Sequence, residues 1–219
     1  MPQSSPRQSR VDPFGEIRAV SARGIFMGNR GILHDADGRV GTARWRLKAW
    51  LVCRTDFRGR HRQVMAPNRY TELFFLDEAT ALAAGHRPCF ECRRHAFLAF
   101  RGAWAAGNSW AAEAPPRVAD IDSRLHAERV VPRTRRKRTW LGHIDELPDG
   151  TMIAGADDPG TAFLLFRQHL LPWRFEGYGR PEPRAKKGNV TVLTPPSTVA
   201  ALAAGYAPVL HPSAHEDSR

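Results

Sequence analysis

The chain has 219 residues, of which 33 are Lys or Arg and 22 are Asp or Glu, so its formal net charge is +11 at pH 7. Its three cysteines argue against a disulfide-stabilised secreted domain, and the lack of a long apolar run argues against a membrane-spanning protein. We therefore expect a soluble, cytoplasmic protein with no membrane partner. The composition does not indicate whether the protein is a monomer or an oligomer. A basic chain favours polyanionic partners, above all nucleic acid, although an arginine-rich coding bias would give the same charge.

The N-terminal region predicts a short tail followed by strands. Residues 1–13 are polar and contain Pro and Ser, and we expect them to be disordered. Glycine recurs among small apolar residues from 17 to 41, and Asp37-Gly38 is typical of a tight turn. We expect strands near residues 24–26, 32–34 and 45–53.

The next segment predicts a strand, a capped helix and a pair of cysteines. A short apolar run precedes Asp77, a favourable N-cap for a helix that ends at Gly85, where glycine tolerates left-handed backbone. Cys89 and Cys92 follow in a C-x2-C turn, and nearby arginines favour their thiolate forms. Cys53, at the end of an apolar strand, adds a third sulfur. The three are candidate Zn²⁺ ligands; a redox pair or three buried cysteines without metal are the alternatives.

Residues 48–94 resemble the Ada-type metal-binding domain, the zinc module of bacterial DNA methylphosphotriester repair proteins. The resemblance rests on a strand that ends in Cys53, the segment 74–85, and the motif Arg87-Pro88-Cys89-x-x-Cys92-Arg93. In that family four cysteines bind zinc, and the first of them accepts a methyl group. The resemblance implies that Cys53 takes this first position and that Cys89 and Cys92 take the last two.

The second cysteine of the family falls on Phe57, which cannot bind a metal. Either a histidine completes the site or the zinc keeps an open position. His61, on the same loop, is the first candidate for the fourth ligand, ahead of His95 and His126. His86 stands where the family has phenylalanine, which indicates a packing position.

Cations and aromatic rings alternate in the loop that follows Cys53. This pattern suits a surface that follows a nucleic-acid strand, with arginines for the phosphates and rings for the bases. A solvated loop beside the metal is the alternative. The candidate nucleic-acid contacts in this loop are Arg54, Arg58, Arg60 and Arg62.

Two helices are predicted after the cysteines. Phe97, Phe100 and Trp104 share the apolar face of the first, which Gly107 ends. The second is expected over 118–131, with an apolar stripe that includes Ile121.

The polar side of the second of these helices holds candidate catalytic residues. Asp122 and His126 lie at i and i+4, and an acid that orients an imidazole is common beside a metal or in general-base catalysis. Zinc deaminases combine P-C-x-x-C with H-x-E, and this chain has both in reverse order. Glu128 would then shuttle protons, with Asp122 orienting His126. An exposed helix surface with one salt bridge is the alternative.

The C-terminal part begins after the basic run 133–138, which is either a phosphate clamp or a solvated linker. Its candidate nucleic-acid contacts are Arg135, Arg136, Lys137 and Arg138. Short apolar runs separated by turns predict strands at 151–154, 162–166, 170–175 and 189–193. Thr194 is expected to cap a last helix that begins at Pro195.

These patterns predict an α+β protein. We expect a disordered tail over 1–13, an Ada-like zinc-binding module over 14–107, a helical segment with a basic linker over 108–139, a small β-rich part over 140–211 and a tail over 212–219. The leading hypothesis is a zinc-stabilised nucleic-acid-binding protein in DNA repair or modification, with DNA favoured over RNA. The alternatives are a zinc-dependent hydrolase or deaminase-like enzyme acting on nucleic acid or nucleotides, and a methyl acceptor at Cys53.

Overall fold

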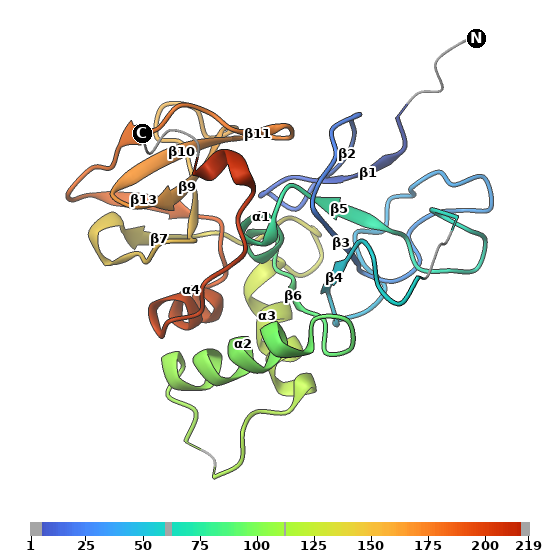
Figure 1. The fold of residues 1–219 in the computed structure, drawn as a ribbon, viewed down its shortest axis with the longest axis horizontal. Helices are drawn as coiled ribbons and strands as arrows, with labels where there is room; N and C mark the ends of the chain where they lie inside the picture. The colour runs from blue at the N-terminus through green and yellow to red at the C-terminus, as the bar shows by residue number, and fades with distance from the viewer. Residues whose placement is uncertain (1–5, 60–62, 112, 216–219) are drawn as a thin grey trace.

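The computed structural model describes residues 6–59, 63–111 and 113–215. Figure 1 shows two β-sheets on either side of a short helix, α1 (Glu78–Ala83), with the other helices gathered at the bottom of the view. Helices and strands both contribute to the structure, so the predicted α+β class is confirmed. In the described part of the chain, no helix is long and apolar enough to cross a membrane.

The N-terminal sheet contains β4, which carries Cys53, and β6, which directly precedes Cys89. Its six strands run in the order β2-β1-β5-β3-β4-β6. Their bounds are Gln8–Val11 (β1), Ile17–Ala19 (β2), Phe26–Asn29 (β3), Leu51–Arg54 (β4), Leu73–Phe75 (β5) and Arg87–Pro88 (β6). The pairs β1–β5 and β4–β6 are parallel, and the other neighbours are antiparallel. The β4–β6 pair matters for the site because it joins two segments that are far apart in the sequence.

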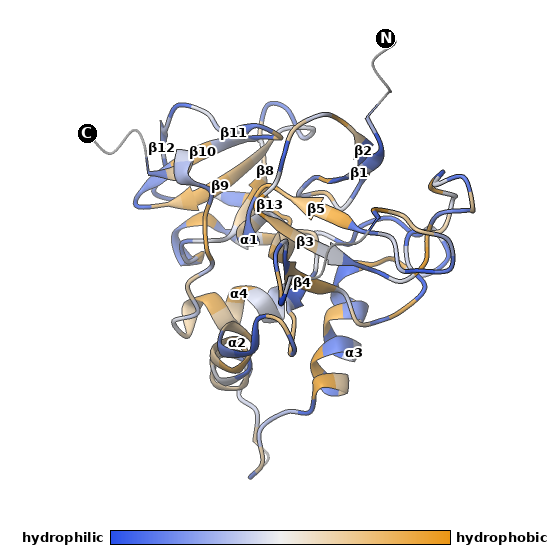
Figure 2. Ribbon diagram, turned by 45° about the vertical axis from the view of Figure 1, so that its right-hand side comes forward, coloured by the Kyte–Doolittle hydropathy of each residue, from blue (hydrophilic) through white to orange (hydrophobic). Residues whose placement is uncertain are grey.

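The C-terminal sheet is antiparallel and confirms that this part of the chain is rich in strands. Its order is β11-β10-β9-β8-β13-β7, and β12 pairs with β10. Figure 2 shows β9 and β8 in the orange of hydrophobic residues, and their buried side chains pack against Ala79 and Ala83 of α1. The strands are Trp140–His143 (β7), Met152–Ala154 (β8), Ala162–Phe166 (β9), His169–Arg174 (β10), Gly177–Tyr178 (β11), Glu182–Pro183 (β12) and Asn189–Val192 (β13).

Three longer helices pack together beneath the sheets. They are α2 (Arg94–Gly107), α3 (Val118–Arg129) and α4 (Pro196–Ala203), and two short 3₁₀ helices span Ile144–Glu146 (η1) and Pro212–Ala214 (η2). The predicted apolar face of α2 is confirmed, because Phe97, Phe100 and Trp104 are buried. Helices α2 and α4 approach closely at Gly107, where an added Cβ would lie 2.1 Å from the carbonyl oxygen of Ala200.

Two adjacent carboxylates at the start of α1 connect the two halves of the chain. Asp77 caps the helix, as predicted, through a 2.9 Å hydrogen bond from a backbone N–H, and it also accepts one of 2.7 Å from the hydroxyl of Tyr178. Glu78 accepts two hydrogen bonds from Arg93, of 2.6 and 2.8 Å, and one of 2.6 Å from Tyr206. The C-terminal part is therefore attached to the N-terminal sheet through α1.

The predicted tails are wrong in part. Strand β1 lies inside the segment 1–13 that the sequence predicts to be disordered, and its Ser9 and Val11 are buried. Burial against the sheet overrides the polar composition of this segment. At the other end, Ala214 of η2 is buried although it belongs to the predicted tail 212–219.

Two local predictions also fail. Residues 32–34 form no strand in the structure, where His34 makes only an isolated bridge with Val40. Thr194 does not cap α4, because its hydroxyl accepts a hydrogen bond of 2.9 Å from the backbone N–H of Met152, and Pro195 holds the N-cap position instead. A contact distant in the sequence thus takes the oxygen that a local cap would use.

We predict that Glu78→Gln strongly destabilises the protein, because it leaves the buried guanidinium of Arg93 without a compensating charge. The free energy of unfolding should fall by about 3 to 5 kcal/mol, measured by urea denaturation followed by circular dichroism. Asp37→Asn is the matched control, since it breaks an exposed ion pair with Arg39 and should have a much smaller effect. Equal effects of the two substitutions would contradict the role assigned to Glu78.

Candidate metal centre

The fold brings the three cysteines together, as the sequence predicts. Cys53 lies on β4, where it pairs with Met27 of β3. Cys89 directly follows β6, and its backbone N–H donates to the carbonyl oxygen of Val52 (2.9 Å), so the parallel β4–β6 pairing places it beside Cys53. Cys92 closes the turn, and all three sulfurs lie within 4.8 Å of one another.

Two buried ion pairs hold the cysteine turn in place. Before the turn, Arg87 donates two hydrogen bonds of 2.8 Å to the carboxylate of Asp122 on α3. After the turn, Arg93 donates two hydrogen bonds to the carboxylate of Glu78 on α1. Paired N–H donors fix both the position and the orientation of the arginine. The backbone between Arg87 and Arg93 is therefore anchored at both ends.

The electrostatics of the three sulfurs favour a cation between them. Hydrogen bonds from the thiols of Cys53 and Cys92 hold the pKa of Cys89 well below its usual value. Hydrogen bonding to Cys89 and Cys92, together with burial, raises the pKa of Cys53. One thiolate is therefore easily formed, but three adjacent thiolates repel one another unless a cation compensates their charge. The cluster can hold a metal ion through Cys53, Cys89 and Cys92.

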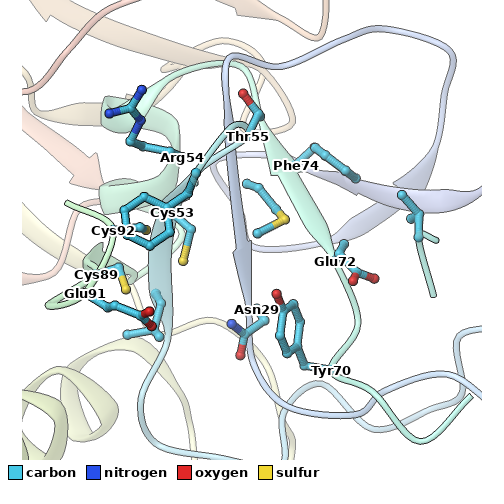
Figure 3. Close-up of a pocket in the computed structure, with 14 residues that line it drawn as sticks. Asn29, Cys53, Arg54, Thr55, Tyr70, Glu72, Phe74, Cys89, Glu91 and Cys92 are labelled. Carbon is cyan, nitrogen blue, oxygen red and sulfur yellow. The ribbon is translucent and has the colours of Figure 1, made fainter. Parts of the chain in front are cut away.

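All three cysteines line a cavity of about 420 Å³ on one face of the N-terminal sheet. Figure 3 shows the cysteines on one side of this cavity and Tyr70 and Glu72 on the other. Met27, Leu51 and Phe74 are among the side chains that make its wall partly apolar. A metal held by the three sulfurs would thus be accessible to a ligand, unlike one enclosed in a protein core.

The sequence analysis missed Asn29 and Glu72 of this cavity, whereas Tyr70 belongs to the basic and aromatic segment predicted to contact nucleic acid. Asn29, Tyr70 and Glu72 supply polar groups, and the 3 % exposed Glu72 accepts a hydrogen bond of 2.7 Å from the backbone N–H of Met65. A signal was present: Tyr70, Glu72 and Phe74 alternate with period two, which places them on one face of the extended chain leading into β5.

The predicted catalytic residues have other partners. Asp122 binds Arg87, so its predicted pairing with His126 is wrong; Nδ1 of His126 lies 3.2 Å from the guanidinium of Arg129. Glu128 accepts hydrogen bonds from Arg124 (2.5 Å) and from the hydroxyl of Ser197 (2.6 Å) at the start of α4. None of these predicted residues lines the cysteine cavity or joins the cysteine cluster. Their contacts support packing of α3, and proton shuttling at the sulfurs has no geometric basis.

The structure brings no predicted histidine to the sulfurs among the residues it describes. His61, the first candidate, lies outside the described residues, as do Arg60 and Arg62. His95 lines a different surface cavity beside α2 and α4. His86 is fully buried, with its ring 4.6 Å from that of Phe75, as expected of a packing position.

The remaining basic candidates fall into two groups. Arg54 borders the cysteine cavity, with its guanidinium pointing away from the sulfurs in Figure 3, and Arg58 lies 5.0 Å above the ring of Phe57. In the basic run, the predicted nucleic-acid contact at Lys137 is wrong. Its amine points inward and donates a hydrogen bond to the carbonyl oxygen of Ala83, so it does not face a nucleic acid. The three arginines of the run that were predicted to contact nucleic acid are exposed: Arg135, Arg136 and Arg138.

We predict that the purified protein holds one metal ion per chain and that Cys89→Ser abolishes tight binding, because two sulfurs alone form a weak site. Metal content after dialysis, measured by elemental mass spectrometry on protein whose fold is verified by circular dichroism, tests this. His126→Ala is the control and should keep the full metal content. Loss of metal in His126→Ala, or its retention in Cys89→Ser, would overturn the assignment.

Comparisons of the chain with protein-family models, with curated proteins and with solved structures found no match.

Proposed function

We propose that this protein is a zinc-dependent nucleic-acid-binding protein in which Cys53, Cys89 and Cys92 hold the metal. The observation that carries the proposal is the cluster of three sulfurs at the wall of an accessible cavity in a strongly basic chain. Thiolates are soft ligands, and a tetrahedral site built from sulfur is typical of zinc. The Ada-type resemblance supports the same metal and a partner that is DNA.

The surroundings of the metal centre supply the contacts that a nucleic acid needs. Arg54 ends β4 and Arg58 lies in the loop that follows it, where their charges can meet phosphates. Tyr70 and Phe74 line the cavity with aromatic surface, which can receive an unstacked base. Zinc would fix β4 and the cysteine turn in one geometry, so that cations and rings keep their spacing.

We predict salt-dependent binding of DNA, measured by fluorescence anisotropy with labelled single- and double-stranded DNA and RNA of one sequence. The logarithm of the affinity should fall linearly with the logarithm of the salt concentration. Arg58→Ala should weaken binding and lower this slope by about one, as loss of one phosphate contact does. Arg180→Ala, which removes an exposed arginine of the C-terminal part, is the matched control and should bind as the wild type does.

Two results would count against the nucleic-acid proposal. One is an affinity that does not change with salt, since phosphate contacts release counterions. The other is unchanged binding after removal of the metal by a chelator, which would separate nucleic-acid binding from the zinc centre. Stronger binding of RNA than of DNA would retain a nucleic-acid partner and reject the DNA preference.

A second candidate function is transfer of a methyl group to Cys53. The observation that favours it is that the cavity reaches all three sulfurs, so an electrophile could approach a metal-bound thiolate. In this reaction the sulfur attacks the methyl carbon of a methylphosphotriester. A C–S bond forms, the C–O bond breaks, and the phosphodiester leaves with the electron pair.

Mass analysis of cysteine peptides after incubation with methylphosphotriester DNA tests this second candidate. We predict methylation of Cys53 in zinc-loaded protein and none in protein stripped of metal. Cys92 is the most exposed of the three cysteines, so an unspecific reagent such as methyl iodide should modify it first. Methylation by the DNA at Cys92, or at no cysteine, would contradict transfer to Cys53.

A further inference from the structure

A second site emerges on the opposite face of the same strands. Residues alternate across a strand, so Asn29 and Leu51 face the cysteine cavity, whereas the adjacent Arg30 and Trp50 face the other way. There the guanidinium carbons of Arg30 and Arg129 lie 4.1 and 3.9 Å from the centroid of the Trp50 ring. The aromatic ring thus holds two cations close to each other.

These cations are buried without a direct ion-pair partner in the described part of the chain. Arg30 and Arg129 are each 1 % exposed, and the amine of Lys137 is buried nearby. Among the described residues, no carboxylate forms an ion pair with any of the three. The carboxylates whose charge reaches these cations form ion pairs elsewhere: Asp12 with Arg18 at 3.4 Å, Glu16 with Arg44 at 2.8 Å, and Asp122 with Arg87 at 2.8 Å. Buried charges are costly unless they are paired.

The cluster also keeps hydrogen-bond donors unused. Nη2 of Arg30 and Nε of Arg129 are buried and have no hydrogen-bond partner. The other donors of these side chains are occupied: Nη1 of Arg30 binds the carbonyl oxygen of Gly15 (2.9 Å), and Nη1 of Arg129 binds that of Gly85 (2.8 Å). Buried polar atoms are rarely left unpaired, so each unused donor calls for an acceptor.

Both arginines and Lys137 line one small recess. Its rim carries two more cations, Arg44 and Arg135, and Glu16 is its only acidic member among the residues that the structure describes. The recess measures about 20 Å³, which suits one or two water molecules or a single oxyanion and excludes a nucleobase.

Burial and mutual repulsion make the charged forms of these side chains unfavourable. Burial lowers the pKa of Arg30 to about 9, and burial together with Arg30 lowers the pKa of Lys137 to about 7. Burial and the charge of Arg30 also lower the pKa of Arg129. An anion in the recess would reverse these shifts, because an opposite charge stabilises each protonated form.

We propose that this recess binds one phosphate group, supplied either as inorganic phosphate or as the terminal group of a phosphate monoester. Nη2 of Arg30 and Nε of Arg129 would donate hydrogen bonds to its oxygens, and Lys137 would add charge. The site is separate from the metal centre, and its existence does not depend on zinc or on the proposed nucleic-acid binding.

Thermal unfolding of the full chain with inorganic phosphate, compared with chloride at equal pH and ionic strength, tests the proposal. Phosphate should raise Tm by a few degrees along a saturable curve, because a ligand that binds only the folded state stabilises it. A parallel titration with adenosine 5′-monophosphate distinguishes the sources. A stronger effect of the nucleotide assigns the site to phosphate monoesters, and a stronger effect of phosphate assigns it to the free ion.

Lys137→Met is the informative variant, since it removes a buried charge and retains a similar apolar volume. We expect its Tm without phosphate to equal or exceed that of the wild type, while the phosphate-induced rise falls to less than half. Lys186→Met, at an exposed lysine of the C-terminal part, should keep the full rise. Equal stabilisation by chloride, or a full phosphate effect in Lys137→Met, would overturn the proposal. A purely structural Lys137 predicts instead that the variant loses stability and that phosphate has no special effect.

Discussion

Two buried arginine–carboxylate pairs set the position of the cysteines. Arg87 binds Asp122 on α3, and Arg93 binds Glu78 on α1. The turn between them carries two of the three sulfurs, and the third lies on β4, which pairs with β6. The candidate metal centre is therefore not an isolated C-x2-C turn. Its geometry depends on contacts that also hold α1, α3 and the C-terminal part in place.

Strands β3 and β4 separate two chemically different environments. One face presents three sulfurs to a cavity with apolar walls and a buried acid, Glu72. The other face presents guanidinium groups stacked on Trp50 above a small recess. The first environment suits a soft metal and the second suits an oxyanion.

Local patterns were predicted well because their physics is local. Asp77 caps α1 and Gly85 follows its end with positive φ, as their side chains and spacing require. The cysteine cluster was also predictable, since C-x2-C restricts two sulfurs to one turn and a buried strand holds Cys53. The α+β class followed from apolar runs and turns in the second half of the chain.

Tertiary partners were not predictable in the same way. Helical spacing places Asp122 and His126 on one face, yet the carboxylate binds Arg87, which lies 35 positions earlier. Lys137 belongs to a run of cations that looks solvated in the sequence, but the bridge between Val130 and Lys137 folds its side chain inward. The cations of the recess beside Trp50 (Arg30, Arg129 and Lys137) likewise come from segments that share no sequence motif. Such contacts depend on the packing of whole elements, which a single sequence does not show.

X-ray absorption spectroscopy of the metal-loaded protein tests the central claim most directly, because it counts the sulfurs bound to the metal. The account predicts three sulfur atoms at about 2.3 Å and one nitrogen or oxygen atom in the remaining position. A metal bound by fewer than three sulfurs, or protein that holds no metal when its cysteines are reduced, would contradict it.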